Sequence, residues 1–314
     1  MSKKVLLIAG GGTLGTHTAN ELLRLGAEVD VICLEEKISD RSALRFYQTP
    51  ATDEFLDELF EKNHYDAIVN FIHYEDPEEY RRVYPKLIKN TDHLVFLSSY
   101  RVYADEEHPI TEESPRLYDV LDDEEFLKNE TYAVPKSKCE DFLRNECAND
   151  PFTIVRPVIS FSERRFDLLM YSGRWVFSAV EEGRAIALPE SARRLHAGID
   201  WAGNSGKLIA NLLFKPHTFG KTYNICSGHN MTWEEVAEIY HEVFGINFRW
   251  VSDEEYIDAI PTIREPRIHG WMWYCDRRFD RQMDASKVLE ATGLSRGDLA
   301  TLREGLIAEL KLVK

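Results

Sequence analysis

The chain has 314 residues, of which 44% are hydrophobic and 29% charged, so it is long and apolar enough for one large globular domain or two smaller ones. Its 38 Lys and Arg are outnumbered by 54 Asp and Glu, and the net charge of −16 excludes a general affinity for nucleic acid. A local pocket can differ in sign from the whole surface, so this composition is compatible with a small phosphorylated ligand.

Several classes of protein are disfavoured by what the sequence lacks. The five cysteines are odd in number and include no Cys-x-x-Cys, and the histidines include no helical His-x-x-x-His, so we expect neither a disulfide framework nor a metal site. The N-terminal "VLLIAGGGTLG" is too short and glycine-rich for a signal peptide, and no apolar run approaches the ~20 residues that span a bilayer. We therefore expect a reduced, cytoplasmic protein with no membrane partner.

Strand-like and helix-like segments alternate through the first half of the chain. The run "KKVLLIAG" is typical of a buried parallel strand, and "TLGTHTANELLRLG" is a helical pattern that ends at Gly26. The alternation continues to Ile159 through "AEVDVICLE", "TDEFLDELFEKN" with Thr52 as N-cap, "YDAIVNFI", "PEEYRRVYPKLIKN", "DHLVFLSS", the helix that holds "NETYAVPKSKCEDFL", and "FTIVRPVI". This order predicts βαβ units and an α/β fold with a doubly wound parallel sheet.

Beyond Ser160 the pattern is less regular and richer in Trp and Arg, which predicts a smaller second lobe. The segments "RRLHAGIDWAGNSGKLIANLL" and "KTYNICSG" are typical of a helix and a strand, and we expect them to return to the first lobe. The predicted division is a domain at residues 1–159, joined by 196–226, and a C-terminal substrate-binding lobe made of 160–195 and 227–314.

A glycine-rich stretch, "AGGGTLG", lies between the first strand and the first helix. Gly10, Gly12 and Gly15 fit the pattern Gly-x-Gly-x-x-Gly, in which glycines allow a tight turn and the close approach of a pyrophosphate. The helix that starts at Thr13 and Leu14 offers free N–H groups and a favourable dipole to phosphates. In this position between strand and helix, the pattern predicts a Rossmann domain that binds a dinucleotide.

The second strand ends close to an acid, Glu35, which lies about where an acid binds the ribose 2′-hydroxyl of such a cofactor. Lys37 and Arg41 follow nearby and are suited to a 2′-phosphate instead. The sequence therefore favours NAD and leaves NADP as the alternative.

Tyr132 and Lys136 are four positions apart, so they share one face if their segment is helical. An ammonium beside a phenol favours the phenolate, which can take a proton from an alcohol. The chain has 14 Tyr, so the spacing says little by itself. Pro135 is tolerated only in the first turn of a helix, and we expect the helix to begin at about Thr131 with Thr131 as its N-cap.

Several segments, taken in order, are similar to a known family. "FLSSYRVYAD" resembles a family strand and loop ending Ser-Ser-x-x-Val-Tyr-Gly, and "YAVPKSKCE" resembles Tyr-x-x-x-Lys-x-x-x-Glu. "TIVRPVI", "RLHAGID", "TYNICSG" and "WEEVAEIYHEVFG" resemble its Arg-Pro strand, its substrate-phosphate segment, its Tyr-Asn strand and the helix after that strand. With the glycine loop, the chain resembles the extended short-chain dehydrogenase/reductases of the NAD-dependent epimerase/dehydratase group, which includes enzymes that modify nucleotide-sugars.

The resemblance implies roles for four residues. Tyr132 would act as the base on a substrate hydroxyl, Lys136 would hold the nicotinamide ribose and keep the phenol acidic, and Ser99 would hydrogen-bond the reacting oxygen. Arg194 falls where the family binds substrate phosphate. The resemblance thus implies an NAD-dependent epimerase or reductase that acts on a nucleotide-sugar and forms a homodimer.

Three departures from the family pattern affect these expectations. Tyr100 and Arg101, rather than an acid, follow Ser99, which disfavours a dehydratase. Cys33 stands about where the family has an Asp at the end of the second strand. His73 lies in a segment that replaces the family's Ala-Ala turn, where it would narrow the cofactor region.

Two other hypotheses stay open beside a nucleotide-sugar enzyme. One is an NAD(P)H-dependent reductase of a non-nucleotide keto or hydroxy substrate, and the other is a non-catalytic relative that binds a nucleotide or RNA.

The C-terminal segment "WMWYCDRRFDRQ" has two interpretations. It could meet a diphosphate and stack on a base, or only pack the lobes together, through Arg277, Arg278, Arg281, Trp271 and Trp273.

Overall fold

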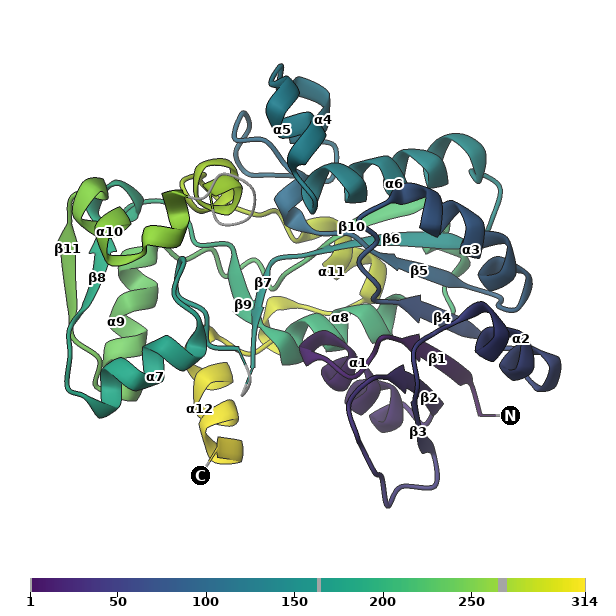
Figure 1. Ribbon diagram of the computed structural model, residues 1–314. Coiled ribbons are helices and arrows are strands. Elements are labelled where there is room, and N and C mark those ends of the chain that lie inside the picture. Colours follow the sequence, from purple (N-terminus) through teal and green to yellow (C-terminus); the bar gives the residue numbers. More distant parts are fainter. Residues whose placement is uncertain (1, 163–164, 265–269, 314) are drawn as a thin grey trace.

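The computed structural model describes residues 2–162, 165–264 and 270–313. A seven-stranded parallel sheet forms its larger part, with helices on both faces (Figure 1). In spatial order, the strands are β10 (Lys221–Ile225), β6 (Phe152–Pro157), β5 (Leu94–Leu97), β4 (Ala67–Asn70), β1 (Lys4–Ile8), β2 (Glu28–Cys33) and β3 (Leu44–Gln48). The prediction of an α/β fold with a doubly wound parallel sheet is confirmed.

Alternate residues of the central strands enter two separate cores because successive side chains of a strand point to opposite faces. In β1, Val5 and Leu7 belong to one core, and Leu6 and Ile8 belong to the other. The helices that cover the two faces are α1 (Thr13–Arg24) and α8 (Ala202–Leu212) on the first, and α2 (Asp53–Lys62), α3 (Pro77–Lys89) and α6 (Ala133–Glu146) on the second.

The chain leaves the sheet after β6 and later returns to it. On its return, α8 packs against α1, and β10 pairs with β6 from Lys221 opposite Thr153 to Ile225 opposite Pro157. Two short strands, β7 (Ile159–Phe161) and β9 (Ile199–Trp201), pair in parallel on the way out and back.

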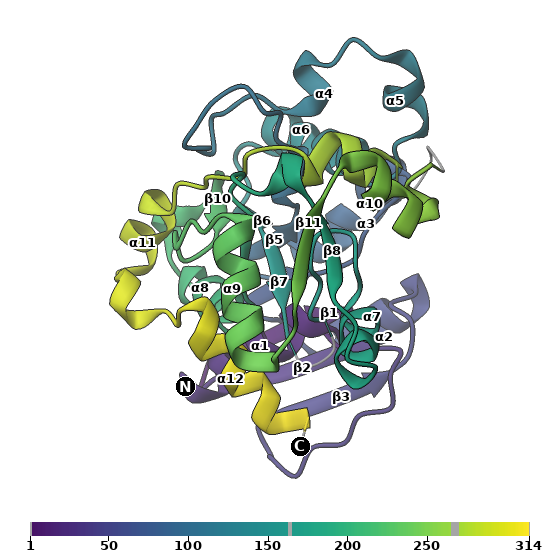
Figure 2. The same ribbon diagram turned by 90° about the vertical axis from the view of Figure 1, so that its left-hand side faces the viewer.

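A smaller second part lies beside the sheet, at the left in Figure 1 and in front in Figure 2. It consists of α7 (Gly173–Glu181), β8 (Ile186–Pro189), α9 (Trp233–Phe244), β11 (Phe248–Val251) and α10 (Asp253–Ala259). The remaining helices are α4 (Leu117–Val120), α5 (Glu124–Asn129), α11 (Ser286–Thr292) and α12 (Leu302–Val313). Of the helices in the described ranges, none combines the length and apolar character that a membrane crossing needs.

One strand of the large sheet was not predicted. β3 lies at the sheet edge and, among the strands that the structure describes, pairs only with β2, from Val29 opposite Leu44 to Cys33 opposite Gln48. Its residues are half-buried or exposed, so it lacks the continuous apolar run that marks the interior strands.

Candidate active site

Three glycines shape the loop between β1 and α1. A Cβ added to Gly10 would lie 2.7 Å from the Leu7 Cβ, and one added to Gly15 would lie 2.3 Å from the Gly10 carbonyl oxygen. Around a Cβ added to Gly12, no heavy atom of the described residues lies within 4 Å, apart from Gly12 itself and its neighbours in the chain. Packing therefore requires Gly10 and Gly15 to be glycine, whereas Gly12 leaves open space of the kind that a closely approaching phosphate fills.

The first turn of α1 has the features of an anion-binding site. Gly12 is its N-cap residue, has extended backbone and makes no side-chain capping bond. The N–H groups that start this helix, at Thr13 and Leu14, point toward the open side of the loop by the geometry of any α-helix, and the helix dipole favours negative charge there. The loop and helix thus fit a dinucleotide pyrophosphate.

An acid and a lysine from the segment after β2 lie on this loop. A Cβ added to Gly11 would be 2.2 Å from Glu35 Oε2. Lys37 Nζ donates to the Gly11 carbonyl oxygen at 2.6 Å and to the Thr16 hydroxyl at 3.1 Å. The two side chains present both an acceptor for ribose hydroxyls and a cation for a 2′-phosphate.

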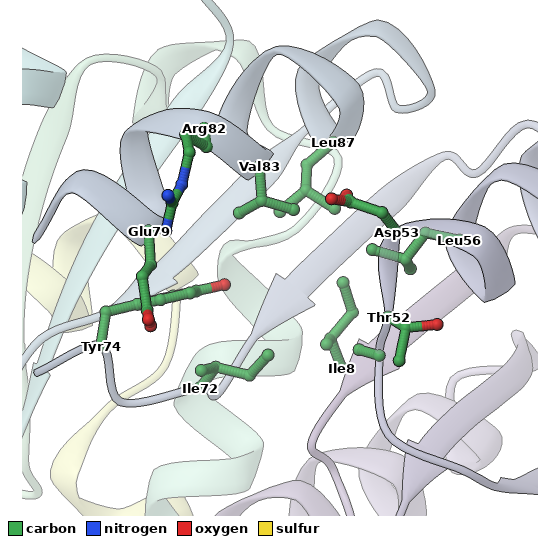
Figure 3. A pocket seen from close by; sticks show the side chains of 11 residues that line it. Ile8, Thr52, Asp53, Leu56, Ile72, Tyr74, Glu79, Arg82, Val83 and Leu87 are labelled. Carbon is green, nitrogen blue, oxygen red and sulfur yellow. The ribbon is translucent and has the colours of Figure 1, made fainter. Parts of the chain in front are cut away.

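A cavity of about 300 Å³ lies between α2 and α3, beside the carboxyl ends of β1 and β4 (Figure 3). Ligands of doubly wound sheets bind outside the carboxyl ends of the strands, so this cavity could hold the adenine end of a dinucleotide. Its lining combines apolar and polar side chains, and includes Ile8, Leu56, Ile72, Val83, Leu87, Thr52, Asp53, Tyr74, Glu79 and Arg82.

Ser99, Tyr132 and Lys136 come together at the end of β5 and the start of α6. Lys136 Nζ lies 5.4 Å from the centre of the Tyr132 ring and donates to the Leu97 carbonyl oxygen at 2.6 Å. Ser99 Oγ accepts a hydrogen bond from the Arg101 backbone N–H at 3.2 Å. Because a hydroxyl can accept and donate at once, Ser99 can also donate its hydrogen, here to the Tyr132 phenol and, when a substrate is bound, to the substrate oxygen.

The surroundings of Tyr132 make its phenol more acidic than usual. Burial would raise the pKa of Tyr132, but the charges of Lys136 and Arg101 and a hydrogen bond from Ser99 outweigh burial and place this pKa below its ordinary value. Burial lowers the pKa of Lys136, although the neighbouring phenol acts in the opposite direction. A phenol of lowered pKa can serve as a general base nearer neutral pH.

A carboxylate, rather than the predicted Thr131, caps α6. The helix begins at Ala133, two residues later than predicted, and its N-cap residue Tyr132 makes no side-chain capping bond. The buried Glu130 Oε2 instead accepts from the N–H groups of Tyr132 at 2.9 Å and Val134 at 3.0 Å. The prediction of a hydroxyl cap is therefore wrong, and the sequence signal for the observed cap is the acid two residues before Tyr132.

Two side chains that flank the Tyr132 ring were not predicted to do so. The Arg101 guanidinium carbon lies 4.5 Å from the ring centre, and the His73 ring centre lies 4.9 Å away. His73 Nε2 lies 2.8 Å from the Thr131 carbonyl oxygen, whereas its buried Nδ1 has no hydrogen-bond partner in the described ranges. Burial and the charge of Lys136 lower the pKa of His73, which favours a neutral ring that donates through Nε2 and leaves Nδ1 as an acceptor.

Three arginines that the sequence offers as phosphate ligands, Arg194, Arg277 and Arg281, pair with other groups of the protein. Arg194 has 80% of its side chain exposed and pairs with Glu234 at 2.8 Å, so its role in binding phosphate stays a prediction. Arg277 is buried, and its guanidinium donates to the Tyr100 hydroxyl at 2.7 Å and pairs with Asp276. Buried Arg281 pairs with the same carboxylate at 3.1 Å. For these two residues, the contacts are those of lobe packing.

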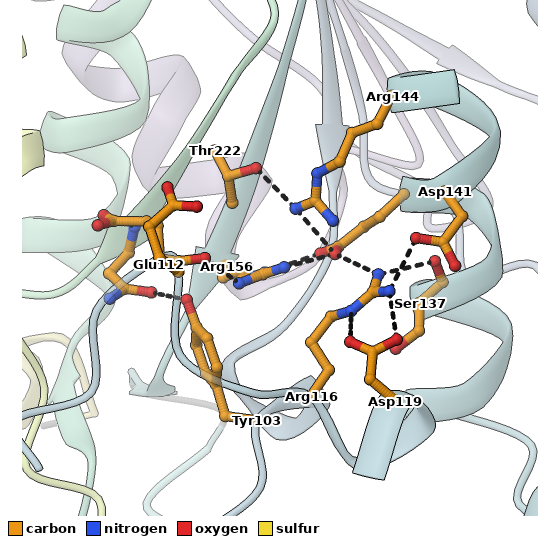
Figure 4. Close-up of polar contacts among 12 residues, drawn as sticks. Tyr103, Glu112, Arg116, Asp119, Ser137, Asp141, Arg144, Arg156 and Thr222 are labelled. Carbon is orange, nitrogen blue, oxygen red and sulfur yellow. Dashed lines mark hydrogen bonds and ion pairs between the residues drawn. The ribbon is translucent and has the colours of Figure 1, made fainter. Parts of the chain in front are cut away.

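Glu140 fixes α6 against the sheet one turn after Lys136. Its buried carboxylate accepts from Arg156 Nε at 2.8 Å and pairs with Arg116 at 3.3 Å and Arg144 at 3.2 Å. Figure 4 shows these three arginines converging from the sheet, the loop and the helix. Burial would raise the pKa of Glu140, but the positive charge of Arg156 and its neighbours lowers it to about 2.

Sequence comparison places this site in a wider context. The chain matches the family model described as "NAD dependent epimerase/dehydratase family" over residues 6–190, which is more than half of its length. A search of curated proteins found no match.

Similar solved structures include two sugar-nucleotide enzymes and the R domain of a biosynthetic pathway. The dTDP-glucose 4,6-dehydratase from Bacillus anthracis in complex with NAD is 15% identical, with a TM-score of 0.70, and the match covers 99% of this chain and 96% of that one. UDP-N-acetylglucosamine 4-epimerase from Bacillus cereus is 19% identical, with a TM-score of 0.66 and the same coverage. The terminal R domain of the myxalamid PKS-NRPS pathway is 16% identical, with a TM-score of 0.66, covering 99% of this chain and 90% of that one. At these identities the likeness shows a shared fold.

Proposed function

The chain belongs to the NAD-dependent epimerase/dehydratase family, and from this premise we propose that it oxidises a sugar hydroxyl of a nucleotide-sugar with NAD or reduces the corresponding keto group with NADH. The observation that carries the proposal is the placement of two cations at the Tyr132 ring, with Lys136 Nζ at 5.4 Å and Arg101 Cζ at 4.5 Å from its centre, which favours a lowered pKa of the phenol. Such a phenol is suited to exchange a proton with an alcohol.

In the proposed reaction, Tyr132 as phenolate takes the proton from the substrate hydroxyl. Ser99 donates a hydrogen bond to the same oxygen, which orients it and stabilises charge as it develops. Lys136 holds the nicotinamide ribose and favours the phenolate. Bound NAD supplies hydride acceptance and return, which protein side chains lack.

The proposed cofactor contacts follow the geometry of the first lobe. Gly10, Gly12, Thr13, Leu14 and Gly15 would hold the pyrophosphate, and Glu35 would bind the adenosine ribose. NAD is favoured because of Glu35, while Lys37 keeps NADP as an alternative. We assign cofactor binding to residues 1–159 with 196–226, and substrate binding to 160–195 and 227–314.

An epimerase or a reductase fits the site better than a dehydratase. A dehydratase needs an additional acid or base beside the reacting sugar, and in this chain Ser99 is followed by Tyr100 and Arg101. The Tyr100 hydroxyl is buried and donates to Asp276 at 3.0 Å. Neither residue is therefore suited to remove a proton from a neighbouring carbon.

Mass analysis of small molecules released from the purified protein tests the proposal. We expect NAD together with a UDP- or dTDP-sugar. Net loss of NADH absorbance with a keto-sugar would identify a reductase, whereas interconversion of two sugars without net redox would identify an epimerase. A protein that binds no dinucleotide would contradict the proposal.

Sedimentation of the purified protein tests the homodimer expected from the resemblance.

One observation favours a second candidate, a reductase of a non-nucleotide substrate. Arg194 is exposed and paired with Glu234, so it is not held ready for a substrate phosphate. If Arg194→Ala leaves the KM for the active substrate unchanged, the non-nucleotide candidate gains; a rise of about tenfold or more supports the nucleotide-sugar. Arg249→Ala is the control because Arg249 is also exposed and paired, with Glu255 at 3.0 Å.

A further inference from the structure

Arg101 places a guanidinium at the proposed reaction centre. It lies in the short η1 helix (Tyr100–Val102) directly after Ser99, with its Cζ 4.5 Å from the centre of the Tyr132 ring. Its side chain is 17% exposed, so a ligand can reach it. A group bound to Arg101 would stand beside the atom on which Tyr132 acts.

The nearest acids do not saturate Arg101. Its Nη2 is 3.7 Å from Glu130 Oε1, and its Nε is 3.6 Å from Asp276 Oδ2, both too long for hydrogen bonds. The Nε atom is buried and lacks a hydrogen-bond partner in the part of the chain that the structure describes. Both acids are also engaged elsewhere, since Glu130 caps α6 and Asp276 pairs with Arg277 and Arg281.

The charges around Tyr132 do not balance. Among the described charged residues around Tyr132 and Asp276, five cations stand against three acids, namely Lys136, Arg101, Arg165, Arg277 and Arg281 against Glu130, Asp276 and Asp167. A Tyr132 phenolate would reduce the excess of two positive charges to one, and the oxidised nicotinamide ring is itself positive. Buried charge without a counterion is costly, so the site has room for one more anion. This excess is local, because the whole chain carries −16.

We propose that the substrate carries a carboxylate next to the hydroxyl that faces Tyr132, and that Arg101 binds this carboxylate. The inference rests on the proposed function and narrows its substrate to nucleotide-linked uronic acids. A guanidinium presents paired N–H donors that match both oxygens of a carboxylate, whereas a neutral hydroxymethyl group offers one acceptor. Arg101 would thus select the anionic sugar.

UDP-glucuronate and UDP-glucose are matched probes because they differ only in a carboxylate against a hydroxymethyl group. With NAD present and ionic strength constant, we expect calorimetry to show UDP-glucuronate binding at least about tenfold tighter. Arg101→Gln should reduce this difference to about twofold or less, while changing the affinity for UDP-glucose by no more than about twofold. Arg249→Gln, an exposed arginine far along the chain, is the control and should keep the wild-type ratio.

Equal affinity of the wild type for both sugars would overturn the inference, and so would a preference that Arg101→Gln retains. The proposed function would still stand if either sugar reduced the bound NAD. If neither sugar binds, the nucleotide part of the proposed function fails, and acetate against neutral acetamide then tests Arg101 alone. Acetate should raise the Tm of the wild type more than acetamide does, and Arg101→Gln should abolish this difference; without such a difference the inference falls.

Discussion

The Glu130 carboxylate accepts a hydrogen bond from the backbone N–H of Tyr132 at 2.9 Å. The same oxygen accepts from Val134, and the other oxygen lies 3.7 Å from Arg101 Nη2. Glu130 is buried, so water does not compete strongly for these contacts. One acid thereby fixes the backbone of the proposed base and helps to place the cation over its ring.

Glu130→Ala should damage both the fold and the reaction. The change leaves two N–H groups at the start of α6 without their acceptor, so we expect the free energy of unfolding to fall by about 1–2 kcal/mol. Because Tyr132 loses its anchor, single-turnover hydride transfer should slow more than cofactor affinity falls. Glu130→Gln keeps an acceptor oxygen and should recover most of the stability. Denaturant unfolding and stopped-flow absorbance measure the two effects.

Glu58→Ala provides the control for this prediction, since Glu58 is an exposed acid on α2. It should change the free energy of unfolding by no more than about 0.5 kcal/mol. A Glu130→Ala variant that matched Glu58→Ala in both stability and rate would show that Glu130 positions nothing.

Two glycines of the same loop should separate cofactor binding from folding. Gly12→Ala adds a methyl group in open space with backbone angles that alanine tolerates, so Tm should stay within about 2 °C of the wild type. The methyl group would occupy the proposed phosphate position, and the affinity for NAD should fall at least about tenfold by calorimetry.

Gly15→Ala should behave in the opposite way. Its Cβ would lie 2.3 Å from the Gly10 carbonyl oxygen, so α1 must shift and we expect a loss of about 1–3 kcal/mol in the free energy of unfolding. If Gly12→Ala bound NAD as the wild type does, the pyrophosphate would have to lie elsewhere.

The acidity of Tyr132 can be measured without any substrate. The difference between the ultraviolet titrations of the wild type and Tyr132→Phe isolates one phenol. This phenol should ionise below the ordinary tyrosine pKa because Lys136 and Arg101 favour its charged form. Either Lys136→Met or Arg101→Gln should raise that pKa, and the reaction rate on the acid side should rise with pH through the same value. A phenol that titrates at or above its ordinary pKa would exclude Tyr132 as the proposed base.

Tyr132→Phe should also lower the rate of hydride transfer by about 10²–10⁴, the usual contribution of a positioned general base. Cofactor affinity should change little because the glycine loop is untouched. Activity that survives this change undiminished would favour a non-catalytic, nucleotide-binding role, which is the remaining alternative from the sequence.

Much of the fold could be predicted because its signals are local. The Thr52 hydroxyl accepts from the Phe55 N–H at the start of α2, and Gly26 has a φ of 84° just after α1 ends, as their residue types indicated. The edge strand Leu44–Gln48 gave no such signal. It needs only β2 as a partner, so its sequence is free of the apolar run that a buried strand requires.

The candidate site could be predicted only where a residue type has a fixed chemical meaning. Ser99, Tyr132 and Lys136 form a recognisable order, and the structure brings them into contact, although their catalytic roles remain predictions. Arg101 and His73 follow the ends of β5 and β4 and reach Tyr132 only through the fold. A lone arginine or histidine after a strand does not indicate such a contact. The contacts of Arg101 and His73 with Tyr132 therefore could not be predicted from the sequence.

Of the acids on α6, Glu140 should cause the largest loss in the free energy of unfolding when it is replaced by a neutral residue. Glu140→Gln leaves the buried Arg156 without its charge partner, and removing one member of a buried pair costs about 3–5 kcal/mol. Glu146→Gln is the control on the same helix, because Glu146 is exposed and pairs with Arg81 at 2.5 Å. An exposed pair contributes about 0–1 kcal/mol, so the control should unfold almost as the wild type does.

The same carboxylate should govern stability in acid. The pKa of Glu140 is lowered to about 2 in the fold, below that of an unfolded glutamate at about 4.3. A group with a depressed pKa stabilises the fold above its unfolded pKa and loses that contribution as pH falls toward the folded value. Wild-type stability should therefore drop between about pH 5 and pH 2, and Glu140→Gln should drop less steeply over the same interval. Parallel slopes for the two proteins would show that Glu140 is not held ionised by its arginines.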